Sequence, residues 1–264
     1  MHTRIAAATG RSVGAIEAFV QAHQPLDADI ALKFIDDYRV QPRSLDGNWQ
    51  VQAYGVALKA LAQQKHPRAQ SVIDAVLAER PTAGERGGVE RFYNERIHRL
   101  EAAVEARCLL EDFDSQMVHR KLGNRGDFFP RRELTQVERD LFTMVDAEVV
   151  NGGFSQYFGN SSGGSWTEDL VMLKRIDAPQ LAGILKRATA VFGWSGPAFD
   201  RDVREQQLEN LSDAAGERLG ECDELWYGAT ESFEAKQTLY VLKNRALLEG
   251  LPDPFPFPHP DVPY

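Results

Sequence analysis

Hydrophobic positions recur along most of the chain with the three-to-four-residue spacing of amphipathic helices. Before residue 80, this spacing predicts helices over 15–22, 27–38 and 48–64, and a further helix that begins at Pro67. We expect these helices to pair as two antiparallel hairpins. Runs of alternating β-branched residues do not exceed four positions, so the pattern predicts an all-α fold.

The helical pattern continues in the second part of the chain. A long helix is expected from about Val89 to about Leu110, and the Gly-rich stretch 123–130 is the best candidate for a domain junction. Thr135 and Glu138 have the spacing of a capping box, which predicts that a helix begins there. This helix is expected to end at 151–153, because the two glycines there can adopt the left-handed conformation without steric cost.

Charge is distributed unevenly along the chain, which has 264 residues and a formal net charge of −9. Residues 1–105 carry as many basic as acidic side chains, so the whole acidic excess lies after them. An asymmetry of this kind is typical of a chain with two distinct parts. We therefore predict a helical-hairpin region over 1–105, a second helical domain over 106–250 and a proline-rich tail over 251–264.

Alternating prolines mark the tail, from Pro252 to Pro260. They exclude a helix and favour an extended polyproline II conformation. Phe255 and Phe257 are the apolar side chains among these prolines. The sequence leaves two interpretations open: the tail packs back on the domain, or it docks on a partner.

Composition narrows the class of protein. With 43% hydrophobic and 26% charged residues, the chain is expected to fold around a core. It has neither an apolar run of membrane-spanning length nor an N-terminal signal pattern, so we expect a cytoplasmic protein without membrane contact. Cys108 and Cys222 lie in apolar segments and are expected to be buried small hydrophobic residues.

Acidic residues concentrate between 200 and 234, where eleven Asp and Glu face three Arg. From Glu205 to Glu221 every fourth residue is acidic. On a helix each such step advances about 6 Å, close to the roughly 6–7 Å between neighbouring phosphates of a DNA strand. We expect these carboxylates on the solvent face as a partner-binding site, with candidate residues Asp202, Glu205, Glu209, Asp213, Glu217, Glu221, Asp223 and Glu224.

Three interpretations of this acidic row stay open. The first is a binding role: like charges four residues apart destabilise a helix by roughly 0.2–0.5 kcal/mol per pair, and a purely structural helix would normally avoid them. A second interpretation is that Gly216 and Gly220 break the helix, which would leave two shorter acidic turns. The third is a solvated acidic face that has no partner, because an acidic surface also favours solubility.

A short segment from Asn151 to Gly163 reads N-G-G-F-S-Q-Y-F-G-N-S-S-G. Its three aromatic residues, Phe154, Tyr157 and Phe158, have the spacing of one helix face, so we predict that they are mostly buried. We also predict a positive φ at one of the two glycines before Phe154. The polar residues that follow can cap the next helix, and the alternative is that the N-S-S-G loop binds a ligand.

This segment and the residues just before it resemble the C-terminal domain of the DNA-mimic protein family. We call the residues that carry the resemblance the signature: Glu148, Asn151, Gly152, Gly153, Phe154, Gln156, Tyr157, Phe158, Asn160, Ser161, Ser162 and Gly163. The resemblance extends over about residues 110–250. It implies an all-helical domain, no cofactor, and an acidic face that occupies a DNA-binding protein.

The sequence shows none of the common catalytic, metal-binding or phosphate-binding motifs. The six histidines lie apart, without metal-ligand spacing, and the chain has no phosphate-binding loop or nucleophile motif. We therefore expect no catalytic residue, metal or cofactor, and an enzyme is the third-ranked interpretation. The leading hypothesis is a non-enzymatic regulator that binds a basic, DNA-binding protein by DNA mimicry, without binding nucleic acid directly. The alternative is a helical scaffold or immunity-type inhibitor that contacts its target through the N-terminal hairpins. The sequence is compatible with a homodimer.

Overall fold

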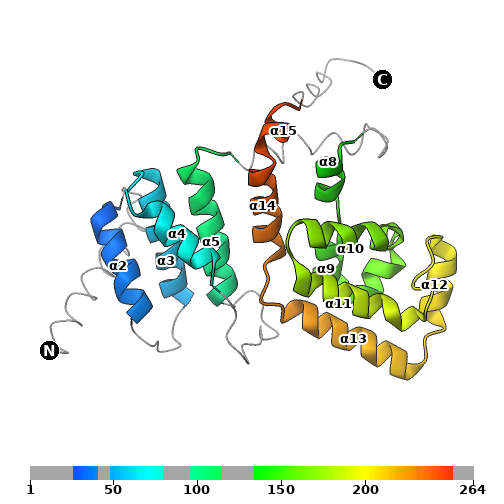
Figure 1. Cartoon of the computed structure of the whole chain (residues 1–264). Coiled ribbons are helices and arrows are strands. Elements are labelled where there is room, and N and C mark those ends of the chain that lie inside the picture. Colours follow the sequence, from blue (N-terminus) through cyan, green and yellow to red (C-terminus); the bar gives the residue numbers. More distant parts are fainter. Residues whose placement is uncertain (1–25, 41–47, 80–94, 115–133, 252–264) are drawn as a thin grey trace, which may run out of the picture. The chain divides into compact units, whose positions relative to one another are not determined.

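The computed structural model describes four stretches of the chain: residues 26–40, 48–79, 95–114 and 134–251 (Figure 1). These residues form twelve α-helices, two short 3-10 helices and no strand, which confirms the all-α prediction. They group into two compact units, the first ending at Asp114. The helix predicted at 15–22, the junction at 123–130 and the tail beyond Leu251 lie outside the described residues.

The first unit packs its helices around α3, which contacts the three others. Its helices are α2 (Ala28–Val40), α3 (Asn48–Gln63), α4 (Ala69–Leu77) and α5 (Glu95–Leu110). Tyr54 of α3 is buried in the core, and its ring centroid lies 4.8 Å from that of Tyr38. Because Ala103 and Ala106 of α5 both belong to this core, the unit does not divide between residues 105 and 106 but continues to Asp114.

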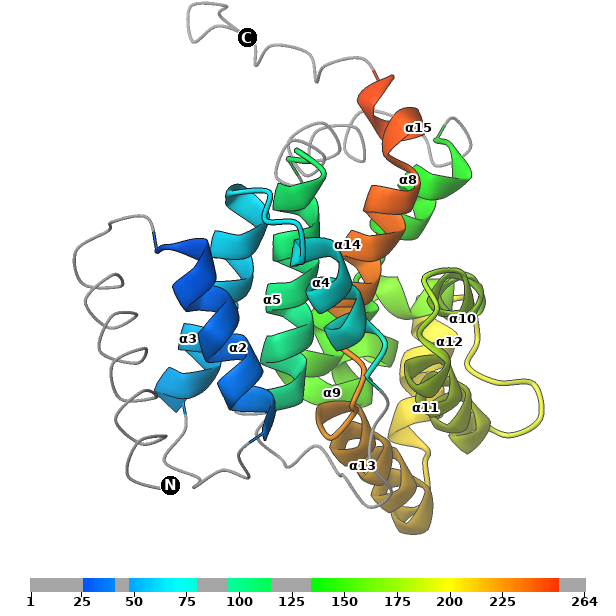
Figure 2. The same cartoon turned by 60° about the vertical axis from the view of Figure 1, so that its left-hand side comes forward.

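The second unit is built around α9 and α11. α9 packs on α12 and α13, and α11 packs on α10 and α13 (Figure 2). None of the helices described in either unit is long and apolar enough to span a membrane. The elements of the second unit are α8 (Gln136–Leu141), α9 (Val145–Gly159), η3 (Ser161–Ser165), α10 (Trp166–Arg175), α11 (Pro179–Thr189), η4 (Ala190–Phe192), α12 (Arg201–Glu209), α13 (Asp213–Tyr227), α14 (Phe233–Lys243) and α15 (Arg245–Glu249).

The helix predicted to begin after Thr135 is two helices, α8 and α9. The capping box is confirmed, because the Thr135 hydroxyl accepts the Glu138 N–H at 3.3 Å and the Glu138 carboxylate accepts the Thr135 N–H at 2.7 Å. α9 begins at Val145, whose N–H donates to the Thr143 hydroxyl at 3.3 Å, and the same hydroxyl donates to Asp169 at 2.7 Å. The break contains neither Gly nor Pro, the residues that usually mark the end of a helix.

Candidate functional site

The aromatic residues of the signature form the centre of the second core. Phe154, Tyr157 and Phe158 are all 0% exposed, which confirms the predicted burial. The Phe154 ring packs edge-on against Trp226 of α13, with 5.5 Å between the ring centroids. Trp226 in turn donates its indole N–H to Asp146 at 3.0 Å. These contacts join α9 to α13, so the aromatic part of the signature has a structural role.

A kink divides α9 into two helical segments at the paired glycines. Gly152 has φ −157°, and Gly153 has φ +73° with ψ −176°. The predicted positive φ is therefore confirmed at Gly153, in a region that is essentially restricted to glycine. The first segment ends here as expected, but a second begins at once with Phe154.

Asp223 caps this second segment from α13. Its carboxylate accepts the Phe154 backbone N–H at 2.7 Å, as an N-cap side chain would. Burial raises the pKa of Asp223, and the hydrogen bond from Phe154 opposes that shift. The side chain is only partly exposed and is directed at the kink. The expectation that Asp223 lies with the partner-binding carboxylates on the solvent face is therefore corrected.

The polar side chains of the signature converge on Glu148. Its carboxylate accepts hydrogen bonds from Gln156 at 2.7 Å, Asn160 at 2.8 Å and Ser162 at 3.2 Å. Asn151 completes the network by donating to the Gln156 side-chain oxygen at 3.1 Å. The bonds, led by that from Gln156, lower the pKa of Glu148, while burial opposes them. The network uses the side chains that a ligand of this loop would need, which argues against a ligand site here.

Replacing Glu148 with glutamine tests this network. We expect the free energy of unfolding to fall by about 1 kcal/mol at neutral pH, because an amide cannot accept from all three donors and the site is partly solvated. The lowered pKa means that the carboxylate stabilises the fold above its unfolded pKa of about 4.3. That contribution is lost as the pH falls through the lower folded value. Urea titrations should therefore show a lower unfolding free energy for the variant at neutral pH. At strongly acidic pH, wild type and variant should have nearly the same unfolding free energy.

The exposed Glu217 supplies the matched control for this change. Glu217→Gln should leave the unfolding free energy nearly unchanged at both pH values, because no described residue pairs with Glu217. A Glu148→Gln variant whose deficit persists undiminished at acidic pH would contradict a role for the ionised carboxylate.

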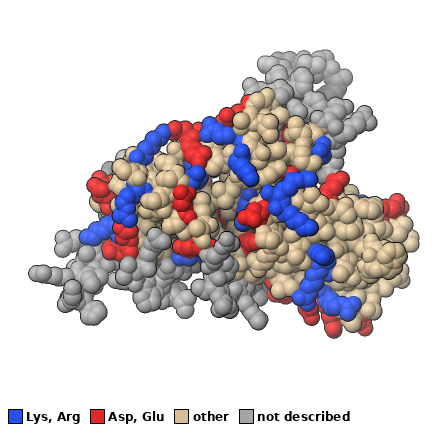
Figure 3. All heavy atoms as spheres, viewed as in Figure 1, with Lys and Arg blue, Asp and Glu red and all other residues tan. Residues whose placement is uncertain are grey.

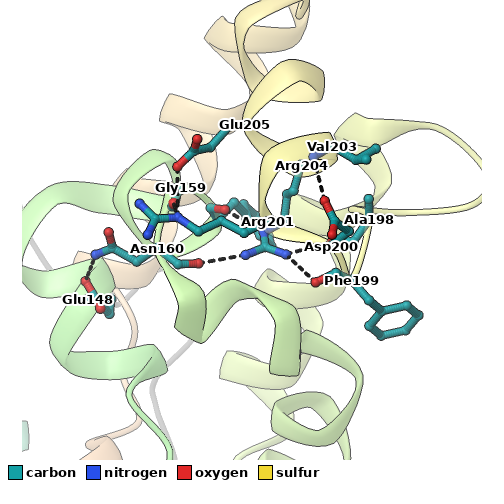
Figure 4. A network of polar contacts seen from close by, with 11 residues as sticks. Glu148, Gly159, Asn160, Ala198, Phe199, Asp200, Arg201, Val203, Arg204 and Glu205 are labelled. Carbon is teal, nitrogen blue, oxygen red and sulfur yellow. Dashed lines mark hydrogen bonds and ion pairs between the residues drawn. The ribbon is translucent and has the colours of Figure 1, made fainter.

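A buried arginine fastens the end of α9 to the loop before α12 (Figure 4). Arg204 is 0% exposed. Its Nε donates to the Phe158 carbonyl at 2.6 Å, and one Nη donates to Asn160 at 2.7 Å. The other Nη donates to the carbonyls of Ala198 at 2.7 Å and Phe199 at 3.0 Å. All four acceptors are neutral carbonyls, and burial lowers the pKa of Arg204.

The last signature glycine makes room for this arginine. A Cβ added to Gly163 would lie 2.5 Å from the Tyr157 carbonyl oxygen and 3.0 Å from Arg204 Nε. Arg204 was not singled out from the sequence and entered only the charge count of residues 200–234. The available signal was its position four residues before Leu208, which places both side chains on the inward face of α12.

The acidic row does not follow one helix. α12 ends at Glu209 and α13 begins at Asp213, with a turn at 210–212 between them. The turn packs Leu211 against the core, and the Asn210 side chain donates to the last turn of α12. The interpretation in which Gly216 and Gly220 break the helix is wrong, because both glycines lie within α13.

Several of the acidic residues between 200 and 234 are used within the fold. Asp200 accepts the Val203 N–H at 3.0 Å and so caps α12, and Glu231 accepts two backbone N–H groups at the start of α11. Glu205 and Glu221 form ion pairs, with Arg201 at 2.9 Å and with Arg187 at 2.7 Å respectively.

Five candidate carboxylates are exposed and make no ion pair with any residue in the described stretches. We call them the acidic surface: Asp202, Glu209, Asp213, Glu217 and Glu224. In the view of Figure 3, acidic atoms gather along the edge that carries α13 in Figure 1, with basic side chains next to them. The surface is thus made by parts of two helices joined by a turn.

Two cavities lined by described residues bring no histidine to a carboxylate. The larger, of about 600 Å³, lies between α10, α11 and the loop 193–196, and has no carboxylate in its lining. The smaller, of about 330 Å³, contains Asp140 and Asp169, which accept hydrogen bonds from Tyr240 and Tyr157 at 2.8 and 2.6 Å. The described residues also contain no group of three or more His, Cys, Asp or Glu that could hold a metal ion.

Comparison with known proteins identifies one similarity. Residues 132–244 match the family model described as DMP19-like protein, which represents a family of DNA mimics. The match spans α8 to α14, including the signature and both acidic helices, and covers less than half of the chain. It lies within the resemblance expected over about 110–250. No curated protein and no solved structure matches the chain.

Proposed function

We propose that the DMP19-like domain binds a basic, DNA-binding protein through the acidic surface and keeps it from DNA by imitating phosphates. The observation that carries this proposal is the set of five exposed carboxylates without ion pairs, all within the residues that match the DNA-mimic family. Unpaired carboxylates keep their full charge, so they attract the Lys and Arg side chains that normally bind phosphate.

The helix geometry supports a phosphate-like spacing over part of the surface. Asp213 and Glu217 are one helical step apart on α13, which is about 6 Å along the axis. Glu209 lies on α12, which the turn at 210–212 separates from α13, so the carboxylates follow two helix axes. A bent row of this kind fits a groove that holds a curved phosphate backbone. Glu205 and Glu221 contribute less, because each is partly neutralised by an arginine.

The same evidence favours a non-enzymatic role. The DMP19-like DNA-mimic family is generally non-enzymatic, and the buried carboxylates near the smaller cavity are engaged by neighbouring hydroxyl groups. The first unit lies outside the matched residues and has its own core, so it can be tested separately as the contact region.

Charge reversal on the acidic surface is the decisive experiment. Glu209→Lys combined with Asp213→Lys should slow association with a DNA-binding protein captured by the wild-type chain at least about tenfold, since steering by charge sets the on-rate. The dissociation rate should change less. Raised salt should weaken the wild-type complex, and duplex DNA should compete with the protein for the captured partner. Surface plasmon resonance at two ionic strengths measures these rates.

The matched control reverses two other exposed carboxylates. Glu234→Lys combined with Glu249→Lys changes the net charge equally but lies outside the acidic surface. Association that slows equally in both double variants would assign the effect to net charge alone. Unchanged affinity in the first variant, without salt dependence, would exclude the acidic surface and direct attention to α2–α5.

A further inference from the structure

A groove on the second unit has no role in the proposed function. α10 and α11 pack side by side and, with the loop 193–196, line an open cavity of about 600 Å³. Leu170, Ala182 and Trp166 contribute to its lining. Trp194 in the loop is 101% exposed. A fully exposed tryptophan beside an apolar groove is a feature of interaction sites.

Two lysines and a glycine complete the groove. Lys174 and Lys186 line it, are exposed, and make no ion pair with any residue of the described stretches. Gly183 of α11 also lines the groove, and a Cβ built there meets no side chain or distant backbone atom within 4 Å. The groove is therefore apolar, open and positively charged at its rim. This chemistry is the opposite of that of the acidic surface, so the groove fits an occupant of a different kind.

We propose that the groove binds the segment 252–264 of a second copy of this chain. The segment has prolines at every second position from Pro252 to Pro260, and polyproline II segments dock against aromatic side chains. Phe255 and Phe257 match the apolar lining. Asp253 and Asp261 give the segment a charge opposite to that of the two lysines. This proposal is independent of the proposed function, because it involves a different face and an oppositely charged ligand.

Reach favours a second copy over the same molecule. The segment follows Leu251 at the end of α15, and α15 lies well away from α12 and the loop that precedes it in both views (Figures 1 and 2). Phe255 and Phe257 are four and six residues beyond Leu251, so at about 3.1 Å per residue they reach roughly 12–19 Å. A second copy removes this limit, and reciprocal exchange of the segments gives a symmetric dimer.

Sedimentation velocity on the full-length chain tests the proposal. The wild type should dimerise at micromolar concentration. Gly183→Leu places an apolar side chain in the groove at a position where a Cβ meets nothing within 4 Å, and Phe255→Ser with Phe257→Ser removes the apolar anchors. Each change should weaken the dimer at least about tenfold. Gly216→Leu on α13, where a Cβ likewise meets nothing within 4 Å, is the control and should leave the dimer unchanged.

Mixing the two defective variants separates this mechanism from others. The Gly183→Leu chain keeps an intact segment, and the double serine chain keeps an intact groove, so a mixture should form a heterodimer that neither forms with itself. A wild type that stays monomeric into the high micromolar range would overturn the proposal. A dimer that tolerates both variants would overturn it as well.

Discussion

Replacing Arg204 with methionine is expected to lower the free energy of unfolding of the second unit by about 3–5 kcal/mol. The site is fully buried, and the change leaves four carbonyl oxygens without their donors. Each unsatisfied buried acceptor costs about 1–3 kcal/mol, partly offset because the charge no longer has to be desolvated. Methionine keeps most of the side-chain volume, so lost hydrogen bonds rather than a large cavity dominate. Urea unfolding followed by circular dichroism measures the loss.

Neighbouring Arg201 provides the control for this prediction. It is exposed, donates to Glu205 at 2.9 Å, and contacts the Gly159 carbonyl at 3.1 Å. Arg201→Met should cost less than about 1 kcal/mol, as exposed ion pairs usually do. Arg204→Lys should fall between the two, since one ammonium cannot reach four carbonyls. An Arg204→Met variant no less stable than Arg201→Met would contradict the structural role of the guanidinium.

Local rules made much of the second domain predictable. The spacing of Phe154, Tyr157 and Phe158 indicated their burial, the paired glycines indicated a positive φ, and the capping box at Thr135 indicated a helix start. Each of these depends on residues close together in the chain. The all-α fold follows from the same periodicity.

Long-range contacts explain what could not be predicted. Arg204 would be placed on the surface by composition alone, but its acceptors include carbonyls more than forty residues away in the chain. Asp223 was assigned to the acidic face because its partner, the Phe154 N–H, is likewise distant in sequence. The glycines of α13 do not break it, because Leu219 and Trp226 are buried and hold the helix on the core.

Long-range contacts also limit what the number of charged residues in a segment can indicate about binding. Eleven acidic residues lie between 200 and 234, but only part of them form the acidic surface. Asp200, Asp223 and Glu231 accept backbone N–H groups, and two others are paired with arginines. The charge that a partner meets is therefore smaller than the local net charge, which makes the individual exposed positions more important to binding than the total.

Replacing Gly153 with alanine is expected to destabilise the second unit by about 2–4 kcal/mol. The conformation at φ +73° and ψ −176° costs a non-glycine residue about 1–3 kcal/mol. The new Cβ would also lie 2.6 Å from an Asp223 carboxylate oxygen and would displace the cap of Phe154, which adds about 1 kcal/mol. Denaturant unfolding at neutral pH measures the sum.

A double-mutant cycle with Asp223→Ala separates the two contributions. Asp223→Ala alone should cost about 0.5–2 kcal/mol through loss of the cap. In that background Gly153→Ala retains only the backbone strain, because the carboxylate it would meet is gone, so the double variant should lose less than the sum of the single variants. Gly216→Ala in α13 is the control and should stabilise the unit by about 0.5–1 kcal/mol, since it lies inside a helix with nothing near its Cβ. Strictly additive losses at Gly153 and Asp223 would show that the kink and its cap do not interact.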